Sequence, residues 1–169
     1  MKAVGNKPSK LVMAQKEQKR KVIITFSKAF PPGHSKAGQL TGFEGKLRAG
    51  TKIHTIRADE KGWWDKCAEA INSGRKYLSM REWTGRPYNS EQRILGEVEK
   101  IGLQSITMTY SSEDELPQAW VDGKEVSVKL LAQNDGLSVE DFVEWFFSTP
   151  LYKGNVFEGK IIHLTDFRY

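Results

Sequence analysis

The sequence predicts a single domain of the α+β class, and three observations support this prediction. Its 169 residues suffice for one domain with a buried core but are few for two. Several short segments are rich in β-branched and aromatic residues, and an Asp-Gly pair separates two of them, as in a tight hairpin. A segment near the C-terminus instead places apolar side chains at helical spacing. We therefore expect several strands and a few helices.

The domain is predicted to begin with a strand and a short helix. Residues 22–26 are rich in β-formers, so they are expected to be extended. Thr41 and Glu44 have the spacing of a capping box, in which each side chain accepts a hydrogen bond from the other residue's backbone amide. A helix over about residues 42–49 follows from this spacing, and Gly50 is a suitable C-terminal stop.

The middle of the chain predicts a second helix and two further strands. Residues 77–83 alternate between polar and apolar side chains, as a strand does. Residues 92–108 are longer and switch the parity of their apolar side chains, which predicts a bulge or bend near residues 99–101. The second helix precedes these strands, and its apolar stripe consists of Trp64, Cys67, Ala68 and Ile71.

The last third of the chain predicts a hairpin, a helix and a closing strand. Asp122-Gly123 lies at the centre of the hairpin over residues 120–126, because this pair accepts the positive φ angles of a primed turn. Residues 156–167 are apolar on both parities, as in a strand buried within a sheet or barrel. The helix between them begins after Ser138, and its apolar stripe consists of Val139, Phe142, Val143 and Phe146.

Basic residues are concentrated in the first 21 positions. This segment holds seven Lys or Arg and one acid, a net charge of +6, whereas the other 148 residues carry 19 basic and 20 acidic groups. We interpret residues 1–21 as a flexible tail and residues 22–169 as one domain. The tail suits phosphate binding by counterion release, with Lys19, Arg20 and Lys21 as candidate nucleic-acid contacts. The alternative is a solvated leader without a partner.

Composition also excludes several classes of site. No apolar run approaches the ~18 residues that span a bilayer, and the N-terminus lacks an apolar signal core, so we expect a cytoplasmic protein without a membrane partner. The single cysteine, Cys67, cannot form an internal disulfide. The histidines at positions 34, 54 and 163 show no metal-ligand spacing. We expect no metal and no cofactor, and oligomeric state is not indicated.

The segment Gly50–Arg57 carries the strongest chemical signal. If residues 53–57 are extended, Thr55 and Arg57 point to one face and His54 to the other, while Lys52 lies at the helix-to-strand junction. An amine, a hydroxyl and a fixed cation in one pocket suit an anionic or carbonyl-bearing ligand, or covalent chemistry on a carbonyl. The alternatives are structural: a lysine at a helix end, an ordinary strand threonine and a surface salt bridge of Arg57.

This motif and its position resemble those of the ASCH domain family, which shares the PUA-like fold. The match consists of Gly50, Lys52, Thr55, Ile56 and Arg57, supported by an acidic segment at residues 134–138, and the resemblance covers residues 22–169. It implies a small β-barrel of about five to seven strands flanked by two to four helices. It also implies a cleft, lined by Lys52, Thr55 and Arg57, that holds RNA or a modified nucleoside or nucleotide.

One branch of that family, the bacterial acetylcytidine amidohydrolases, cleaves an amide with a lysine, a threonine and a glutamate. Lys52 and Thr55 match the first two, and Asp135 stands at the position of the third, one methylene shorter. The resemblance thus implies Thr55 as nucleophile, Lys52 as base and Asp135 as supporting acid. A lysine can act as a base near neutral pH only if burial or a neighbouring cation lowers its pKa, and Arg57 is a candidate for that cation.

Aromatic residues supply the remaining candidates. Trp63 lies off the apolar stripe of its helix and is a candidate to stack on a base, the alternative being interior packing. A second aromatic and basic cluster, which suits RNA or is a solvated hairpin end, consists of Arg81, Trp83, Arg86 and Tyr88.

Three functions stay open: an RNA- or nucleoside-binding module, an amidohydrolase acting on acylated nucleosides, and a protein-interaction domain. The first is favoured because Asp135 replaces the glutamate of the amidohydrolases and because the N-terminal tail is basic.

Overall fold

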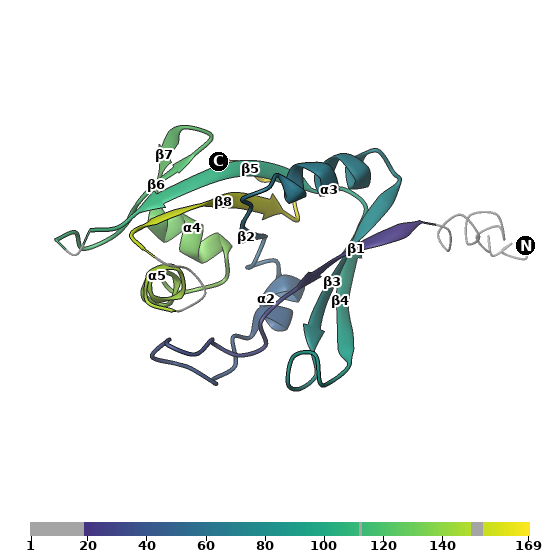
Figure 1. Ribbon diagram of the computed structural model, residues 1–169, viewed down its shortest axis with the longest axis horizontal. Helices are drawn as coiled ribbons and strands as arrows, with labels where there is room; N and C mark the ends of the chain where they lie inside the picture. The colour runs from purple at the N-terminus through teal and green to yellow at the C-terminus, as the bar shows by residue number, and fades with distance from the viewer. Residues whose placement is uncertain (1–18, 112, 150–153) are drawn as a thin grey trace, which may run out of the picture.

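The computed structural model describes residues 19–111, 113–149 and 154–169. This part of the chain contains eight strands in two sheets and four helices, which confirms the α+β class (Figure 1). The described strands form two separate sheets and not one closed barrel, and they exceed the five to seven expected. None of the helices in these residues has the length and apolar character needed to cross a membrane.

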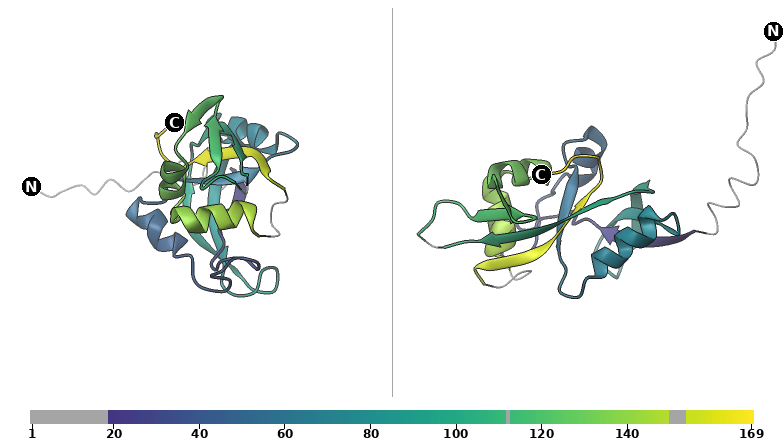
Figure 2. Two further views of the ribbon diagram at one scale, coloured as in Figure 1. Left: turned by 90° about the vertical axis from the view of Figure 1, so that its left-hand side faces the viewer. Right: turned by 90° about the horizontal axis from the view of Figure 1, so that it is seen from above.

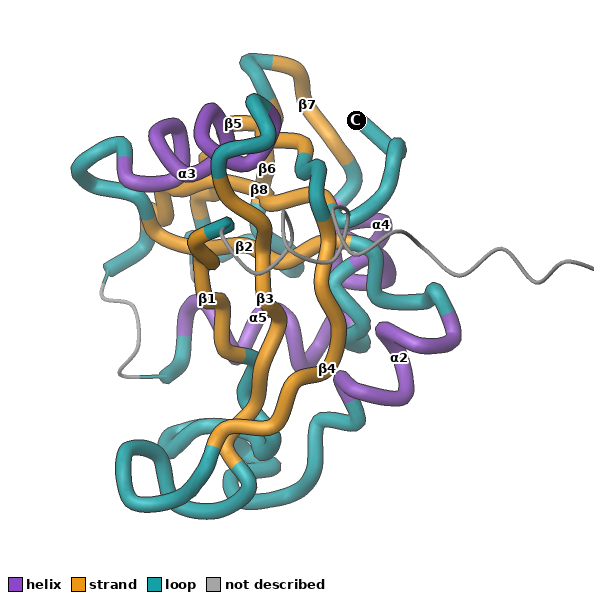
Figure 3. The backbone as a smooth tube through the Cα atoms, turned by 90° about the vertical axis from the view of Figure 1, so that its right-hand side faces the viewer, coloured by secondary structure: helices purple, strands orange, loops and turns teal. Residues whose placement is uncertain are grey.

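One sheet has three strands in the order β1-β3-β4 (Figure 3). They are β1 (Arg20–Thr25), β3 (Lys76–Trp83) and β4 (Gln92–Val98); β1 runs parallel to β3, and β3 antiparallel to β4. The strand begins at Arg20, so Arg20 and Lys21 are strand residues and not part of a tail. Helix α3 (Trp63–Asn72) packs against β3 through its buried apolar face, as the helical spacing predicts.

The other sheet is antiparallel throughout and has the order β2-β8-β5-β6-β7. Helices α4 (Val128–Asn134) and α5 (Val139–Phe147) lie toward one end of the molecule, and α3 toward the other (Figure 2). Helix α5 contacts the sheet where the rings of Phe146 and Phe157 meet, with centroids 4.9 Å apart. The strands are β2 (His54–Ala58), β5 (Gly102–Thr109), β6 (Gln118–Val121), β7 (Lys124–Val126) and β8 (Val156–His163).

The short segment after helix α2 (Phe43–Ala49) is bonded to the end of α4 and to the chain just after β8. The helix ends at Gly50, whose φ of 71° lies in the left-handed region that favours glycine. The next residues turn back, and the Ile53 amide donates to the carbonyl of Asn134 (2.9 Å) at the end of α4. The Ile53 carbonyl accepts from the amide of Leu164 (3.0 Å), just beyond β8. The motif is therefore fixed between a helix end and the sheet.

Several element predictions need correction. The capping box is wrong: Gly42 caps α2 in a left-handed conformation without a side-chain bond, and the Thr41 hydroxyl donates to the Ser27 carbonyl (2.8 Å). Glu44 instead pairs with two arginines. The expected bend within residues 92–108 is a full break, since β4 and β5 belong to different sheets. The hairpin is confirmed, with positive φ at both turn residues, and the closing strand ends at residue 163.

Candidate functional site

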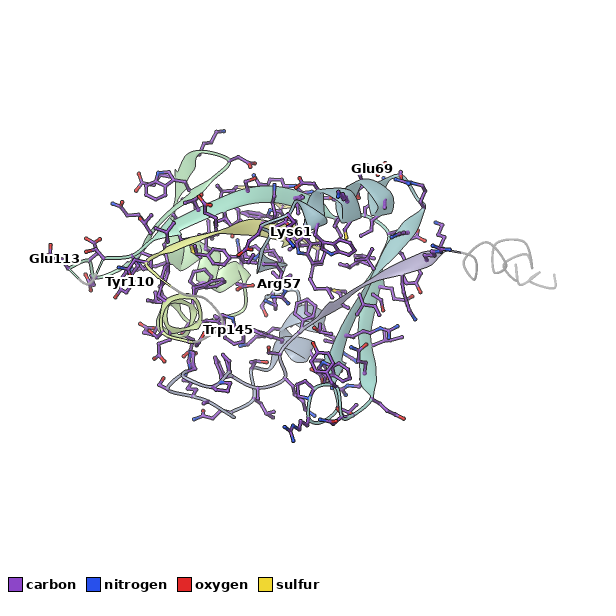
Figure 4. The ribbon with its side chains drawn as sticks, viewed as in Figure 1. Arg57, Lys61, Glu69, Tyr110, Glu113 and Trp145 are labelled. Atoms are coloured by element: carbon purple, nitrogen blue, oxygen red, sulfur yellow. The ribbon has the colours of Figure 1, made fainter. Side chains whose placement is uncertain are left out.

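A cavity of about 180 Å³ lies among β1, α2, β2 and α5. Lys52, Thr55, Arg57 and Asp135 all line it, although Asp135 is 83 positions from Lys52 in the chain. Figure 4 shows Arg57 near the middle of the molecule, between the two sheets. The remaining lining residues are Thr25, Phe26, Ser27, Phe43, Ile56, Leu137, Trp145 and Phe146. The four side chains singled out by the sequence are thus brought together around one space.

Lys52 is the buried cation of the site, with 3% of its surface exposed. Its Nζ donates to Oδ1 and to the backbone carbonyl of Asp135, both at 2.7 Å, and lies 4.2 Å from the centroid of the Phe43 ring. Burial lowers the pKa of Lys52, while the charge of Asp135 opposes this change and that of Arg57 adds to it. The lysine does contact a helix end, but that of α4 and not of its own helix.

Asp135 is the counter-ion of Lys52 and caps the C-terminus of α4. Burial alone raises the pKa of this carboxyl group, but the charge of Lys52 and the proximity of His54 together outweigh burial, so its pKa is lowered. Asp135 is therefore held as a carboxylate. A carboxylate in this position keeps the ammonium charge of Lys52 inside the protein, where an unpaired cation is costly.

His54 lies behind Asp135 and was not predicted to contribute. His54 and Thr55 point to opposite faces of β2, so His54 does not line the cavity. Its Nδ1 nevertheless lies 3.7 Å from Asp135 Oδ1. Its Nε2 is 2.7 Å from the Tyr169 hydroxyl, whose oxygen also accepts from the Asn134 side chain (3.0 Å). If the phenol proton is donated to Nε2, the imidazole proton is on Nδ1, which makes no hydrogen bond to any described residue and faces the carboxylate at 3.7 Å.

The histidine and the tyrosine could be anticipated only in part. His54 alternates with Thr55 along one strand, so its burial on the opposite face follows from the pleat. Its contact with Asp135 depends on how α4 packs, and α4 was not predicted although Ser127 precedes apolar residues at helical spacing. Tyr169 carries no local signal that connects it with residue 54. Burial raises the pKa of the Tyr169 phenol, so this hydroxyl stays protonated.

Thr55 and Arg57 extend from the same face of β2, as the strand parity predicts. Thr55 is 2% exposed, and no residue of the described ranges hydrogen-bonds its hydroxyl, which leaves this group for a ligand. The Arg57 guanidinium donates to the carbonyls of Thr25 (2.8 Å) and Ile56 (3.2 Å). It also lies 5.7 Å from the centroid of the Phe26 ring, so its position is fixed by both walls of the cavity.

The other predicted site residues lie elsewhere. Trp63 is 59% exposed on α3 and does not line the cavity, so its predicted part in this site is not supported by its position. Arg81 donates to the Ser79 hydroxyl within β3, and Arg86 is exposed in the loop after that strand. Lys19 forms an ion pair with Glu99 (3.6 Å) at the start of β1, whereas residues 1–18 of the predicted tail lie outside the described residues.

The size of the cavity limits its ligand. About 180 Å³ is below the roughly 300–1,000 Å³ of pockets that enclose a drug-sized molecule, so the space suits one ring system with small substituents. Aromatic rings of Phe43 and Trp145 supply apolar walls beside the polar side chains of the lining.

The motif residues and the acidic segment lie at the element boundaries that the sequence predicts. The motif directly follows a short helix, and Asp135 stands three residues ahead of the Ser138 that caps α5. Ser138 accepts from the Asp141 amide at 3.1 Å, so the last helix begins where the sequence predicts. No family model, curated protein or solved structure matches the chain.

Proposed function

We propose that the protein binds a nucleobase, as a modified nucleoside or nucleotide or as part of RNA, in the cavity lined by Lys52, Thr55 and Arg57. The observation that carries this proposal is the Thr55 hydroxyl, which no described residue hydrogen-bonds, in one cavity with a buried lysine, a guanidinium and aromatic side chains. We also infer, from the same motif, that the two sheets are a variant of the PUA-like fold of the ASCH type.

The polar groups suit the edge of a nucleobase. The Thr55 hydroxyl both donates and accepts, so it can pair with a ring nitrogen, an exocyclic amine or a carbonyl group. Arg57 supplies N–H donors that suit a carbonyl oxygen or a phosphate. The rings of Phe43 and Trp145, whose centroids lie 5.9 Å apart, give a base an apolar surface to contact. Recognition of a base by stacking and edge contacts is common among RNA-binding proteins.

Amide hydrolysis is the second candidate, and the lowered pKa of Lys52 favours it. The Thr55 oxygen would attack the amide carbonyl carbon of an acylated base while neutral Lys52 takes the hydroxyl proton. The C–N bond would then break, the proton would pass to the leaving amine, and water would hydrolyse the acyl-threonine ester. Asp135 opposes this route, because its carboxylate 2.7 Å from Nζ stabilises the charged form of Lys52. Binding is therefore the better supported function.

A matched pair of variants tests both candidates. Thr55→Val keeps the shape of the side chain and removes its hydroxyl, whereas Thr107→Val makes the same change on β5 outside the cavity. We expect Thr55→Val to weaken binding of cytidine or acetylcytidine about 5- to 30-fold, as loss of one or two hydrogen bonds does, and Thr107→Val to leave it unchanged. Titration calorimetry measures the affinity, and release of acetate from acetylcytidine reports turnover.

The outcomes separate the two functions. Acetate release by the wild type that is lost in Thr55→Val establishes the hydrolase, and binding without release establishes the binding module. Equal affinities of Thr55→Val and the wild type, or no binding of any nucleoside or nucleotide, would remove the basis of the proposal. Circular dichroism of both variants checks that the fold is retained.

A further inference from the structure

A larger groove of about 560 Å³ adjoins the cavity. The two share Thr25, Phe26 and Ser27, so the end of β1 forms a common wall between them. We name it the Trp83–Tyr88 groove, and its lining consists of residues 25–32, Leu40, Trp83, Gly85, Pro87 and Tyr88. The cavity accommodates one ring system, and a larger ligand that passes over the end of β1 reaches this groove.

The far end of the groove presents two aromatic rings. The centroids of Trp83 and Tyr88 lie 5.2 Å apart at an interplanar angle of 51°, and Tyr88 is 88% exposed. Tyr88 also has a φ of 63°, a left-handed conformation that costs a bulky residue free energy. Burial does not offset this cost, because almost the whole side chain faces solvent. The exposed ring of Tyr88 is therefore available to a ligand.

The loop that carries Tyr88 is held in place by its own hydrogen bonds. The Thr84 amide donates to the Glu91 carbonyl (2.9 Å), and the Ser90 hydroxyl donates to the Arg86 carbonyl (2.9 Å). The Ser90 oxygen also accepts from the Gly85 amide (3.0 Å). The two rings are therefore a preformed platform, and a ligand does not have to order the loop.

The charges of the groove are positive. Lys28 is its one charged lining residue, and the Lys28 ammonium group donates to the Thr84 carbonyl (3.3 Å) across the groove. Arg86, between two lining residues, is exposed. Aromatic platforms combined with cations and without acids fit single-stranded nucleic acid, whose bases stack and whose phosphates need cations. An apolar peptide would use the rings but gain nothing from the cations.

We propose that the Trp83–Tyr88 groove holds the nucleotide that neighbours the one in the cavity, so that the ligand is a single-stranded oligonucleotide and not a free nucleoside. This inference rests on the proposed function of the cavity. One base enters the cavity beside Thr55, the chain passes over the end of β1, and the next base stacks on Tyr88 with its phosphate near Lys28.

The test compares a nucleoside with the dinucleotide and trinucleotide that contain it, in ribose and deoxyribose forms. The wild type is expected to bind the dinucleotide at least about 10-fold more tightly than the nucleoside, the gain expected from one stacked base. Tyr88→Ala is expected to abolish this gain and to leave nucleoside affinity unchanged. Tyr88→Phe retains the ring and the gain. Because the side chain is exposed, neither change is expected to disturb folding.

Two further variants complete the design. Trp63→Ala removes an exposed aromatic ring on α3, away from both spaces, and is expected to leave all affinities unchanged. Lys28→Met is expected to lower the slope of log affinity against log salt for the dinucleotide by about 0.7, the value for one phosphate contact on a single strand. Fluorescence anisotropy or calorimetry at several salt concentrations measures both quantities.

Failure of this inference differs from failure of the proposed function. If the nucleoside binds and the dinucleotide binds no better, or if Tyr88→Ala keeps the gain, the groove does not hold a second nucleotide although the cavity binds a first. Capture of apolar peptides in the groove without any dinucleotide gain also overturns the inference. If neither nucleoside nor oligonucleotide binds, the cavity proposal itself fails.

Discussion

Replacing Asp135 by alanine is expected to lower the free energy of unfolding by about 3–5 kcal/mol at neutral pH, the usual cost of breaking a buried ion pair on one side. Lys52 would keep its charge among Phe26, Phe43 and Arg57 without a counter-ion. Denaturation with urea measures the loss. Part of it is expected to return as pH rises toward 10.5, because burial already lowers the pKa of Lys52 and the folded variant would bind fewer protons than the unfolded chain.

Two variants calibrate this loss. Asp135→Asn keeps the shape and one acceptor for Lys52 but removes the charge, so an intermediate loss is expected. Glu69→Ala breaks the ion pair with Arg75 on the outer surface of α3, where Figure 4 shows Glu69, and is expected to cost less than about 1 kcal/mol. A loss for Asp135→Ala no larger than that for Glu69→Ala would contradict a buried, coupled pair.

Acid is expected to destabilise the protein from about pH 6.5 downward, because of His163. Burial and the neighbouring His54 lower the pKa of His163 from 6.5 to about 3. Above pH 6.5 neither state is protonated at this site; below it the unfolded chain takes up a proton and the folded chain does not. Each pH unit then costs about 1.4 kcal/mol, so the free energy of unfolding should fall by about 2 kcal/mol between pH 6 and pH 4.5.

His163→Gln tests the origin of this loss. The glutamine amide can still donate to Gln104 Oε1, the present partner of the imidazole at 2.9 Å, but it does not titrate. The variant is expected to lose stability by a constant amount and to show a flatter dependence on pH between 6 and 4.5. Urea denaturation at both pH values measures the two slopes, and equal slopes for variant and wild type would assign the acid sensitivity to other groups.

Periodicity predicted the parts of the site that are local in sequence. The pleat of β2 places Thr55 and Arg57 on one face, and the helical stripe with Ser138 at its start locates α5. The capping box failed because Gly42 takes a left-handed conformation, which turns the Thr41 hydroxyl toward Ser27. A side-chain spacing alone does not reveal such a backbone turn.

What the sequence could not predict depends on contacts between distant segments. Helix α4 has seven residues, and its serine cap and apolar spacing indicate a helix but not the surface it packs on, so the contact of Asp135 with His54 follows only from the tertiary structure. The division of residues 92–108 between two sheets likewise depends on which strands are available as neighbours. The apolar side chains switch faces near residues 99–101, between β4 and β5, but such a switch does not specify which strand each segment pairs with.

The two backbone hydrogen bonds of Ile53 have a consequence for selectivity. They join the residue after Lys52 to the end of α4 and to the segment after β8, so the backbone segments that carry the lysine and its carboxylate partner cannot move apart without breaking main-chain bonds. A ligand therefore meets a receptor whose shape is set before it arrives, and it gains little from adjustment of the protein. We therefore expect large differences in affinity among related rings, because the protein does not rearrange to accommodate a misplaced substituent.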